Sequence, residues 1–590
     1  MRRLRTLPEA LAQAARAGTG YCFVQDGVDV HRRYEDVLTA SFQVARALRE
    51  AGLRRGDLVA IILADAEQFL TTLFGASMAL VIPASLYPPS PTSDLARYLD
   101  LTAATLRAAG ARAVVTSTTL APELEKLKPT CPDLSLVVTR ESLDAPPIEP
   151  DTMPALGDIA FVQFTSGSTS VPKGVVLTHG NVCANVNAIR GASGLGVGQD
   201  DIAVSWLPLN HDMGFVGMAL CPMYAGRPAV LLPPQVFVRR PAEWLRTLTR
   251  HRGTISFAPN FAYDLCVRRV KERDLDGLDL APWRVAGCGS EPIHAPTLAA
   301  FAEKFAAVGF RETSYFPCYG LAEHVLAATF PRRGRKLRTE TLAGDDLTER
   351  RLARLALDDD NAVTLVSCGG PFPGHKIQIT GEDGRPLPER HVGEIVLAGP
   401  SVMMGYYRQD ELTAQAVREG WLHTGDLGYL SDGELFVCGR AKDIIIVNGR
   451  KYHPQDLEWA VDDLAGVRRG RVVAFGASEP GRADRVVVIV EPSGTVPGEE
   501  LTESIRRQVS GLFGLYVDEV ALVPSGTVGR TTSGKVQRAA TRARYEQLAR
   551  GAALSGLPGS PGAAFGSPGG SPGGSVGGSA RGRHRTTNEG

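Results

Sequence analysis

A loop rich in glycine and hydroxyl groups is the segment of this chain most suited to chemistry. Residues 164–174 read FTSGSTSVPKG, and apolar runs at 159–164 and 175–177 predict a strand on either side. Gly167 would let backbone N–H groups approach an anion, and Lys173 adds a positive charge. The hydroxyl donors of the loop are Thr165, Ser166, Ser168 and Thr169. These groups could hold a polyphosphate, although composition alone favours a solvated hairpin turn.

The two commoner nucleotide-binding motifs do not fit this sequence. A Walker A loop requires G-x-x-x-x-G-K followed by Ser or Thr, but here Lys173 precedes Gly174. A second candidate, GRTTSGKV at 529–536, places Val536 where the Mg²⁺-binding hydroxyl should be. The GCG segment at 287–289 lacks the third glycine of a dinucleotide fingerprint. A phosphate site in this chain would therefore be of another type.

The composition is that of an ordinary globular protein with room for two or more domains. The chain has 590 residues, of which 44% are hydrophobic and 22% charged. Basic and acidic residues balance at 64 each, so bulk charge gives no argument for nucleic-acid binding. Nine cysteines without a C-x-x-C pair favour reduced thiols in a cytoplasmic protein over a disulfide or zinc framework.

No segment of the chain predicts stable membrane insertion. The longest uncharged stretch, 69–87, is interrupted by Gly75 and Pro83, which favours a buried helix leading into a strand. The basic N-terminus has leucines at helical spacing over residues 4–11 and polar residues between them, so we expect a surface helix rather than a signal peptide.

The sequence pattern of the helices and strands around the phosphate loop predicts an α/β fold. From about residue 20 to 430, helical patterns alternate with short β-branched runs, which indicates layered α/β sheets with largely parallel strands. Examples of these runs are 58–63, 113–115, 136–138 and 229–232. Glycine-punctuated strand patterns at 392–405 predict a small barrel-like β subdomain or a small antiparallel sheet.

The chain changes character near residue 433, where a small α+β domain is expected. One of its helices should begin at Pro454. Another should present one apolar face made of Leu501, Ile505, Val509 and Leu512. We predict a large N-terminal domain at 1–438, a small mobile C-terminal domain at 439–550, and a flexible Gly/Pro/Ser-rich tail at 551–590.

Six further segments give the chain a family resemblance. They are WLPLNHDMG at 206–214, GCGSEP at 287–292, CYGLAE at 318–323, WLHTGDLGY at 421–429, GRAKDIIIVNGRKYHP at 439–454 and TTSGKVQR at 531–538. With the phosphate loop, and in this order, they make residues 20–545 resemble the adenylate-forming superfamily of acyl-CoA synthetases, peptide-synthetase adenylation domains and luciferases. The resemblance implies that a carboxylate attacks the α-phosphate of ATP, with Mg²⁺ bound, to give acyl-AMP and pyrophosphate. Such a reaction needs positioning and charge neutralisation rather than a covalent nucleophile.

The resemblance also implies a role for individual residues in binding ATP. Residues 165–169 and Lys173 should cradle the β- and γ-phosphates, and Glu323 should be the Mg²⁺ carboxylate. Asp426 should accept the ribose hydroxyls with support from Arg440. The adenine pocket and its neighbourhood should comprise Gly289, Ser290, Glu291, Pro292, Tyr319, Gly320, Leu321 and Ala322, with Tyr319 stacking near the base.

The resemblance implies three roles for residues beyond the nucleotide. Lys535 should bridge the acyl carboxylate and the α-phosphate, and His211 should line the acyl channel near the reacting carboxylate. Lys442 should be the hinge about which the small domain rotates between the two half-reactions. The ordinary alternatives are a solvated loop lysine for Lys535, a structural histidine for His211, a surface helix residue for Glu323, a turn aspartate for Asp426 and a surface arginine for Arg440.

Several details resemble fatty acyl-AMP ligases more than CoA ligases. They are YGLAE at 319–323, GSEP at 289–292, LVSCGGPFPG at 365–374, GRKYHPQDLE at 449–458 and a polar stretch at 331–361. The last lies where that subfamily carries an insertion, and it could form a short exposed subdomain or be an ordinary variable loop. The resemblance implies that the acyl group passes to the phosphopantetheine thiol of an acyl carrier protein or polyketide synthase, supplied in trans. Such carriers are usually acidic, and the arginines at 468–471 could meet one or simply form a solvated face.

Other functions remain open from the sequence. A CoA ligase is the rival within the same chemistry, and a non-catalytic acyl-AMP-binding protein is the rival from another class. An amino-acid adenylation domain would need an aspartate for the substrate amine, for which Asp264 is the candidate. The fatty acid is expected to be of medium to long chain. Its tunnel could be lined by residues that could equally be core, namely Met213, Phe215, Met218, Met223, Phe257, Phe261 and Tyr263.

Overall fold

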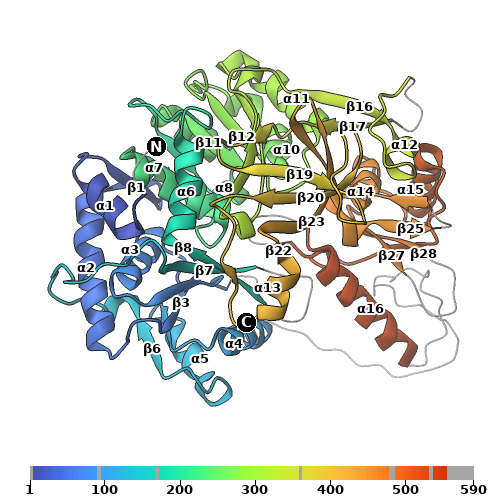
Figure 1. Cartoon of the computed structure of the whole chain (residues 1–590). Coiled ribbons are helices and arrows are strands. Elements are labelled where there is room, and N and C mark those ends of the chain that lie inside the picture. Colours follow the sequence, from blue (N-terminus) through green and yellow to red (C-terminus); the bar gives the residue numbers. More distant parts are fainter. Residues whose placement is uncertain are drawn as a thin grey trace, which may run out of the picture.

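Two seven-stranded sheets form the larger part of the molecule, and a smaller antiparallel sheet and a C-terminal α+β subdomain follow them (Figure 1). The computed structural model describes residues 4–89, 95–165, 172–357, 362–447, 450–477, 485–530 and 536–554. The layered α/β fold with largely parallel strands is therefore confirmed.

The first sheet carries the predicted phosphate loop. Its strands, in spatial order, are β21 (Gly405–Tyr406), β8 (Lys173–Thr178), β7 (Ile159–Thr165), β4 (Ile82–Ser85), β3 (Leu58–Ile62), β5 (Ala113–Thr116) and β6 (Leu136–Thr139). Strands β3 to β7 pair in parallel, whereas β8 is antiparallel to both β7 and β21. The LVAII run of β3 is buried throughout, as a parallel strand covered on both faces requires.

The second sheet is parallel except at one edge. Its strands, in spatial order, are β13 (Tyr315–Pro317), β12 (Val285–Cys288), β11 (Ile255–Ala258), β9 (Ala203–Ser205), β10 (Ala229–Leu231), β1 (Gly20–Gln25) and β2 (Val28–Arg33). Only β2 is antiparallel, joined to β1 by a tight hairpin. The carboxyl ends of the parallel strands therefore meet at one edge, where open α/β sheets usually bind ligands.

The predicted β subdomain is an antiparallel sheet. Its strands are β19 (Lys376–Thr380), β20 (Gly393–Ala398), β22 (Val417–Arg418), β23 (Trp421–Ser431) and β24 (Glu434–Arg440). A smaller sheet comprises β14 (Tyr319–Gly320), β15 (Ala327–Phe330) and β18 (Gly370–Pro371). The strand pattern at 392–405 thus marks β20 and β21, which belong to different sheets.

Helices cover the two large sheets and the antiparallel sheet. They are α1 (Leu7–Ala15), α2 (Tyr34–Glu50), α3 (Ala66–Met78), α4 (Leu95–Ala109), α5 (Ala121–Glu125), α6 (His179–Arg190), α7 (Cys221–Ala225), α8 (Pro234–Arg239), α9 (Ala242–Arg250), α10 (Asn260–Arg269), α11 (Ala295–Phe305) and α13 (Asp410–Ala416). The expected N-terminal helix is α1, which begins after a capping box of Thr6 and Glu9. The stretch 69–87 is the buried α3 followed by β4, as predicted. Within the described residues no helix is long and apolar enough to cross a membrane.

The C-terminal subdomain has a hydrophobic core of its own. Its elements are β25 (Ile445–Val447), β26 (Arg450–Tyr452), α14 (Pro454–Asp462), β27 (Val467–Ala477), β28 (Arg485–Pro492), α15 (Gly498–Phe513), β29 (Glu519–Leu522) and α16 (Arg538–Leu554). Helix α14 begins at Pro454, as predicted. Leu501, Ile505 and Val509 are buried on α15, but Leu512 is exposed. Leu512 lies in the last turn of the helix, where Phe513 packs against the core. The prediction that Leu512 belongs to the apolar face was therefore wrong.

The polar stretch at 331–361, called the insertion below after the predicted feature, is folded in its described part. It contains β16 (Thr339–Ala343) and α12 (Gly344–Thr348), and β16 pairs with β17 (Ala362–Val366). The buried Glu340 carboxylate ties the insertion to the antiparallel sheet, because it accepts from Tyr429 Oη at 3.0 Å and Ser431 Oγ at 2.8 Å. Arg338 and Arg390 donate to the same carboxylate at 3.0 and 3.1 Å. The insertion is therefore a fixed part of the surface rather than a loose loop.

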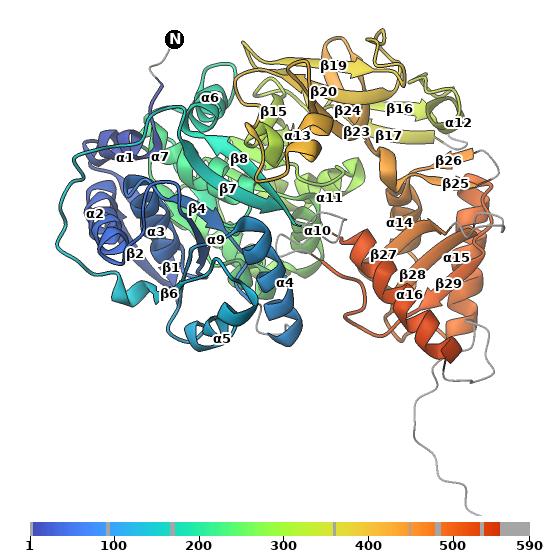
Figure 2. The same cartoon turned by 60° about the horizontal axis from the view of Figure 1, so that its bottom comes forward.

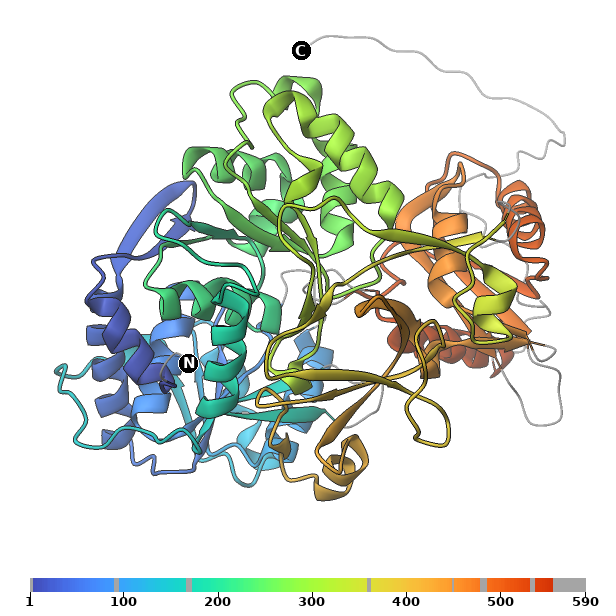
Figure 3. The ribbon, with the colours of Figure 1, turned by 45° about the horizontal axis from the view of Figure 1, so that its top comes forward.

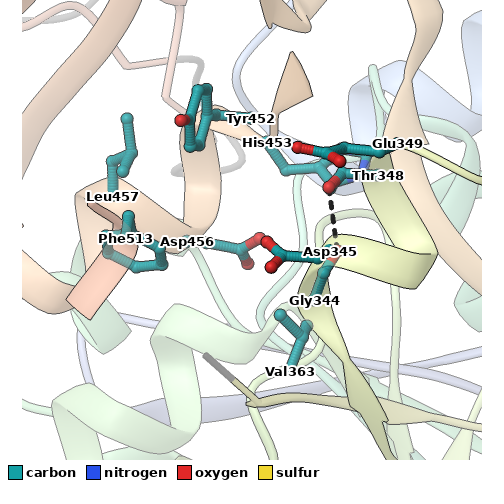
Figure 4. Close-up of a pocket in the computed structure, with 10 residues that line it drawn as sticks. All are labelled: Gly344, Asp345, Thr348, Glu349, Val363, Tyr452, His453, Asp456, Leu457 and Phe513. Carbon is teal, nitrogen blue, oxygen red and sulfur yellow. Dashed lines mark hydrogen bonds between the residues drawn. The ribbon is translucent and has the colours of Figure 1, made fainter. Parts of the chain in front are cut away.

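The insertion faces the C-terminal subdomain across a small cavity (Figure 4). Figures 1, 2 and 3 agree in placing the insertion beside the orange strands and helices of that subdomain. Asp345 of α12 and Glu349, which directly follows this helix, lie on one wall, and Tyr452 and Asp456 lie on the other. Any rotation of the C-terminal subdomain must open this contact.

The carboxyl of Asp456 should make stability depend on pH. Burial and the nearby Glu458 raise its pKa to about 7, although Arg538 opposes the shift. The folded protein then retains a proton that the unfolded chain releases above about pH 4. Stability should therefore fall as the pH rises from about 4 to 7. Asp456→Asn should remove this fall and raise the unfolding midpoint at pH 8 by a few degrees, corresponding to about 1–2 kcal/mol.

The measurement is thermal unfolding of both proteins at pH 5 and pH 8. Asp276→Asn, a substitution at an exposed aspartate, is the control and should behave as the unsubstituted protein at both pH values. An Asp456→Asn midpoint that drops between pH 5 and pH 8 as much as that of the unsubstituted chain would contradict this assignment.

Candidate active site

Three of the segments singled out by sequence lie at the carboxyl edge of the second sheet. His211 follows β9, Ser290 follows β12, and Cys318 and Tyr319 follow β13. These strands are parallel neighbours or lie one strand apart. Segments separated by about 110 residues therefore meet at one place, because the strand order rather than the sequence order decides their proximity.

A hydrogen-bonded cluster forms where the ribose-binding residues were predicted. Tyr319 Oη donates to Asp426 Oδ2 at 2.8 Å, and Arg440 Nε donates to Asp426 Oδ1 at 3.0 Å. Asp426 and Arg440 are cross-strand partners in the β23–β24 register, which fixes their separation. The Asp426 side chain is 10% exposed, whereas that of Arg440 is 56% exposed. Burial raises the pKa of the Asp426 carboxyl. Burial also raises the pKa of the neighbouring Tyr319 phenol. The structure thus presents one carboxylate, already oriented from two sides, at the edge of the site.

A second cluster joins Glu323 to the lysine of the phosphate loop. Tyr406 Oη donates to Glu323 Oε1 at 2.9 Å, and Lys173 Nζ lies 5.2 Å from the centre of the Tyr406 ring. This proximity results from strand pairing, since Tyr406 of β21 is the register partner of Val175 on β8. Glu323 is half-buried in a short 3₁₀ turn, Ala322–His324, so it is not a surface helix residue. A carboxylate and an ammonium group therefore flank the base of the loop.

Two non-glycine residues in these segments have left-handed backbones. Ser290 has a φ of 72°, and the β-branched Val325, two residues after Glu323, has a φ of 66°. Val325 is fully buried, so its surroundings hold it in a conformation that costs on the order of 1–3 kcal/mol. Such strain is common where the chain is shaped for a ligand.

The neighbouring glycines are required by close packing. A Cβ atom on Gly320 would lie 1.8 Å from the Leu326 carbonyl oxygen, and one on Gly289 would lie 2.7 Å from Cys318 Sγ. Both glycines therefore allow the strand ends to approach one another at the site.

A cavity opens between these segments and the apolar interior. It is lined by Ile189, Leu195, Asp212, Met213, Gly217, Phe257, Ser290, Cys318, Tyr319, Gly320, Leu326, Ala327 and Phe330. Ser290, Tyr319 and Gly320 belong to the predicted nucleotide segments, while most of the other residues are apolar. One end of the cavity is thus suited to a nucleotide and the remainder to a hydrocarbon chain.

An unusual helix forms one wall of the cavity. Residues Met213–Leu220 (η3) form a π-helix of eight residues, which is rare and frequently marks a functional site. Among the apolar residues considered from sequence, Met213 and Phe257 line the cavity. Phe215, Met218, Met223 and Tyr263 are core residues instead.

His211 lies two residues before this helix begins. Its Nδ1 is 2.6 Å from Asp212 Oδ1, and the same oxygen accepts from Met213 N at 2.7 Å. Asp212 lines the cavity and His211 is its neighbour rather than a lining residue. The structure therefore places His211 at the edge of the cavity with its ring oriented by Asp212.

Other predicted adenine-pocket residues are more dispersed. Glu291 Oε1 accepts from Phe261 N at 2.6 Å and so caps the start of α10. Pro292 is exposed, Leu321 is half-buried, and Ala322 is buried beside Glu323. Glu291 thus has a local structural contact in addition to any contact with a base.

Several predicted residues lie outside the described part of the chain. Ser166, Gly167, Ser168 and Thr169 of the phosphate loop and Lys535 are among them, and for Thr165 the backbone end of β7 is described. The residue after Lys535 is described: Val536 forms a β-bridge with Arg530. The Arg530 guanidinium lies 5.9 Å from the centre of the Phe261 ring, next to the helix start that Glu291 caps. The ends of the segment containing Lys535 therefore lie close to the candidate site.

Sequence reasoning missed Tyr406 and the apolar wall made of Gly217, Leu326 and Phe330. Tyr406 reaches Glu323 only through β21, a two-residue strand that carries no periodic pattern of its own. Leu326 directly precedes β15 and Phe330 is its last residue, and the apolar run of this strand is indistinguishable from ordinary core in the sequence.

The residues around Glu323 suit a magnesium ion that arrives with a nucleotide. Mg²⁺ is usually held by one or two carboxylates together with substrate phosphates and water. Among the described residues, Glu323 is not part of a three-ligand protein cluster. The half-buried Glu323 carboxylate fits that donor set, and the part of the chain that the structure describes offers no all-protein cage around it.

Comparisons with known proteins agree with this geometry. The family model described as AMP-binding enzyme matches residues 11–407. A protein of Caulobacter vibrioides (strain NA1000 / CB15N), provisionally named an acyl-CoA synthetase, is 36% identical over 551 residues, covering 92% of this chain and 95% of the relative. The medium-chain-fatty-acid–[acyl-carrier-protein] ligase of Moorena producens (strain JHB) is 34% identical over 557 residues, covering 90% of this chain and 92% of that ligase.

A solved structure extends the agreement to three dimensions. A structure from work on fatty acyl-adenylate ligases of E. coli and L. pneumophila superimposes with a TM-score of 0.87 at 34% identity, covering 92% of this chain and 98% of that chain. The family match spans more than half of the chain. The chain belongs to the AMP-binding family of adenylate-forming enzymes and is a ligase of that family.

Proposed function

We propose that the protein activates a medium- to long-chain fatty acid to acyl-AMP and transfers the acyl group to the phosphopantetheine thiol of a carrier protein. The observation that carries this proposal is the cavity that joins Ser290 and Tyr319 to the apolar wall of Gly217, Leu326 and Phe330. A fatty acid seated there would present its carboxylate beside the nucleotide segments and bury its chain among apolar side chains.

In the proposed adenylation step, some residues bind the nucleotide and others neutralise its charge. Asp426 would accept the ribose hydroxyls, with its orientation fixed by Tyr319 and Arg440. Lys173 and the hydroxyl-rich loop would hold the outer phosphates, and Lys535 would neutralise charge that develops between the carboxylate and the α-phosphate. No covalent bond to the protein is needed, because the carboxylate oxygen attacks phosphorus and pyrophosphate leaves with the electron pair.

Mg²⁺ would be held by Glu323 together with the phosphates of ATP. When bound, it supplies charge neutralisation for the triphosphate. Tyr406 holds one oxygen of that carboxylate and so sets the direction in which the other faces.

An amino-acid substrate fits this site less well than a fatty acid. Asp264, the candidate partner for a substrate amine, instead pairs with Arg268 at 2.5 Å and with Arg469 of the C-terminal subdomain at 3.9 Å. Asp212 lines the cavity, but its Oδ1 is engaged by His211 and by the start of its own helix. Both carboxylates therefore have local partners that a substrate amine would have to displace.

A carrier protein rather than free CoA is the acceptor that we propose. Two observations support it: the folded insertion in contact with the C-terminal subdomain, and the name of the Moorena relative, which specifies an acyl-carrier-protein substrate. A CoA ligase is the alternative, which the provisional name of the Caulobacter relative favours. The surface arginines at 468–471 offer little to separate the two, since Arg468, Arg469 and Arg471 have partners within the chain.

Fatty-acid-dependent exchange of labelled pyrophosphate into ATP tests the adenylation step alone. We expect exchange with fatty acids of medium to long chain and little exchange with amino acids. Exchange that requires an amino acid, or that occurs with neither substrate class, would contradict the proposed substrate.

The acyl length should respond to a substitution in the apolar wall. A Cβ on Gly217 would lie 3.1 Å from Leu326 Cδ2 and point into the cavity region. Gly217→Phe should lower the rate of adenylation of a long-chain acid by about tenfold or more, because the ring occupies the volume of the chain. Short acids are the internal control and should be adenylated at nearly the original rate. An equal loss for all chain lengths would remove Gly217 from the acyl wall.

We also propose that the C-terminal subdomain rotates as a unit about the residues that follow Arg440, close to the predicted boundary between residues 438 and 439. Lys442 lies in the 3₁₀ turn Ala441–Asp443 between β24 and β25, where the chain leaves the antiparallel sheet. Lys442→Pro would fix φ at this position and restrict Ala441. We expect transfer to the thiol to slow by about tenfold or more while adenylation changes only a few-fold. Lys442→Ala is the control, and equal losses in both half-reactions for the proline variant would contradict a hinge.

A further inference from the structure

A cluster of metal-ligating side chains lies at the edge of the second sheet, away from the adenylation site. Cys22 and His31 are cross-strand partners in the β1–β2 hairpin, and Asp29 is the residue two positions before His31. Because side chains alternate along a strand, these three residues lie on one face of the hairpin. His251 follows the last residue of α9 and reaches the same face.

The ligand atoms are close enough for one small cation to bind between them. The donor atoms of Cys22, Asp29 and His251 all lie within 4.8 Å of one another. His251 Nε2 is 3.1 Å from Asp29 Oδ2, and Cys22 Sγ is 4.0 Å from His31 Nε2. Two ligands of a tetrahedral zinc ion lie roughly 3.3–3.6 Å apart, so side-chain rotations that move the donor atoms by up to about an ångström would bring them to that spacing.

The contacts within the cluster leave a place for a positive charge. His251 Nε2 contacts both Arg250 Nε at 3.3 Å and Asp29 Oδ2 at 3.1 Å. In the tautomer that carries its proton on Nδ1, Nε2 is an unprotonated nitrogen that faces a carboxylate oxygen. A cation at this point would satisfy both atoms, while Arg250 Nη2 could keep its 2.9 Å bond to the other carboxylate oxygen.

The Cys22 thiol completes the chemical character of the cluster. Cys22 is 5% exposed, and burial and then Asp29 raise the pKa of its thiol to about 11. A bound divalent metal reverses that preference by binding the thiolate directly. Sulfur and imidazole ligands select zinc over magnesium or calcium, which prefer oxygen.

We propose that Cys22, Asp29 and His251 bind one zinc ion, with His31 within reach of the fourth position. The ion would join the edge strand β2 and its hairpin to the end of α9. Its role is structural, because none of these residues lines the cavity of the adenylation site.

The test uses the full chain, treated with a chelator and then supplied with zinc. We expect one equivalent of zinc to remain after gel filtration and the unfolding midpoint to rise by several degrees. Cobalt in place of zinc should give a thiolate-to-metal charge-transfer band. A chain that retains no zinc and shows no cobalt band would overturn the proposal.

Matched variants locate the metal. Cys22→Ser and His251→Gln should each lower zinc affinity at least about tenfold, and Cys22→Ser should abolish the cobalt band. His391→Gln, a histidine substitution in the antiparallel-sheet region, should bind zinc as the original chain does. If Cys22→Ser fails to fold, the half-buried His251→Gln carries the test. Zinc bound equally by His251→Gln and the original chain would place the ion elsewhere and overturn the assignment.

Discussion

Replacement of Lys535 by alanine is expected to lower the rate of acyl-adenylate formation by about 10²-fold or more. Its ammonium group is proposed to stabilise charge that appears only as the carboxylate attacks the α-phosphate, and removal of one such donor typically costs 10²–10³ in kcat. The described residues at the two ends of its segment are Arg530 and Val536, which form a β-bridge, and the Arg530 guanidinium lies 5.9 Å from the centre of the Phe261 ring. The loss should appear in kcat for adenylation with little change in the KM for ATP. Single-turnover formation of acyl-AMP measures it directly.

The second half-reaction supplies the control for this variant. When acyl-AMP is provided ready-made, transfer to the thiol should proceed at nearly the original rate, because Lys535 acts before that step. Lys376→Ala, at an exposed position of β19, should leave both half-reactions unchanged. An adenylation rate of Lys535→Ala within about threefold of the original would exclude the lysine from the transition state.

Replacement of Asp426 by alanine should weaken the use of ATP by about 10²-fold in kcat/KM. The variant loses the proposed acceptor of the ribose hydroxyls and leaves Tyr319 and Arg440 without their partner. Hydrogen bonds to a charged group contribute about 1.5–3 kcal/mol each, which sets the scale of the effect. Ribose contacts are present in both the ground state and the transition state, so the change should fall mainly on the KM for ATP. Steady-state kinetics against ATP concentration measures it.

A modified nucleotide separates recognition from folding. The original protein should discriminate against 2′-deoxy-ATP, whereas Asp426→Ala should use both nucleotides nearly equally. Asp383→Ala, a substitution at an exposed turn aspartate of the same sheet, should retain the original KM and discrimination. If Asp426→Ala still favours ATP over 2′-deoxy-ATP by the original factor, Asp426 does not contact the ribose.

The sequence allowed much of the architecture to be predicted because local patterns matched the final elements. The apolar runs on either side of the phosphate loop became β7 and β8, and Pro454 marked the start of α14. These signals are local, since they depend on strand alternation and on the fixed φ of proline. Leu512 was wrongly assigned to the apolar face of its helix. The spacing of apolar residues along a helix does not show which of its turns extend beyond the core and are exposed to solvent.

The site was predicted less completely because its contacts join distant segments. Asp426 and Arg440 could be chosen individually, but their hydrogen-bonded cluster with Tyr319 depends on the β23–β24 register and on a contact spanning 107 residues. Tyr406 contacts Glu323 because it lies on a two-residue strand, which is too short to show a periodic pattern in the sequence. The cluster of Cys22, Asp29 and His251 was not predicted from the sequence, because His251 lies far from the other two along the chain and the three match no metal-binding motif.

The most direct test of the account is mass spectrometry of the products formed from a long-chain fatty acid, ATP, Mg²⁺ and two competing acceptors, CoA and a phosphopantetheinylated carrier protein. We expect acyl-AMP and acylated carrier protein, with little acyl-CoA. Abundant acyl-CoA with an unmodified carrier protein would contradict the proposed acceptor, and the absence of acyl-AMP with every fatty acid would contradict the proposed reaction itself.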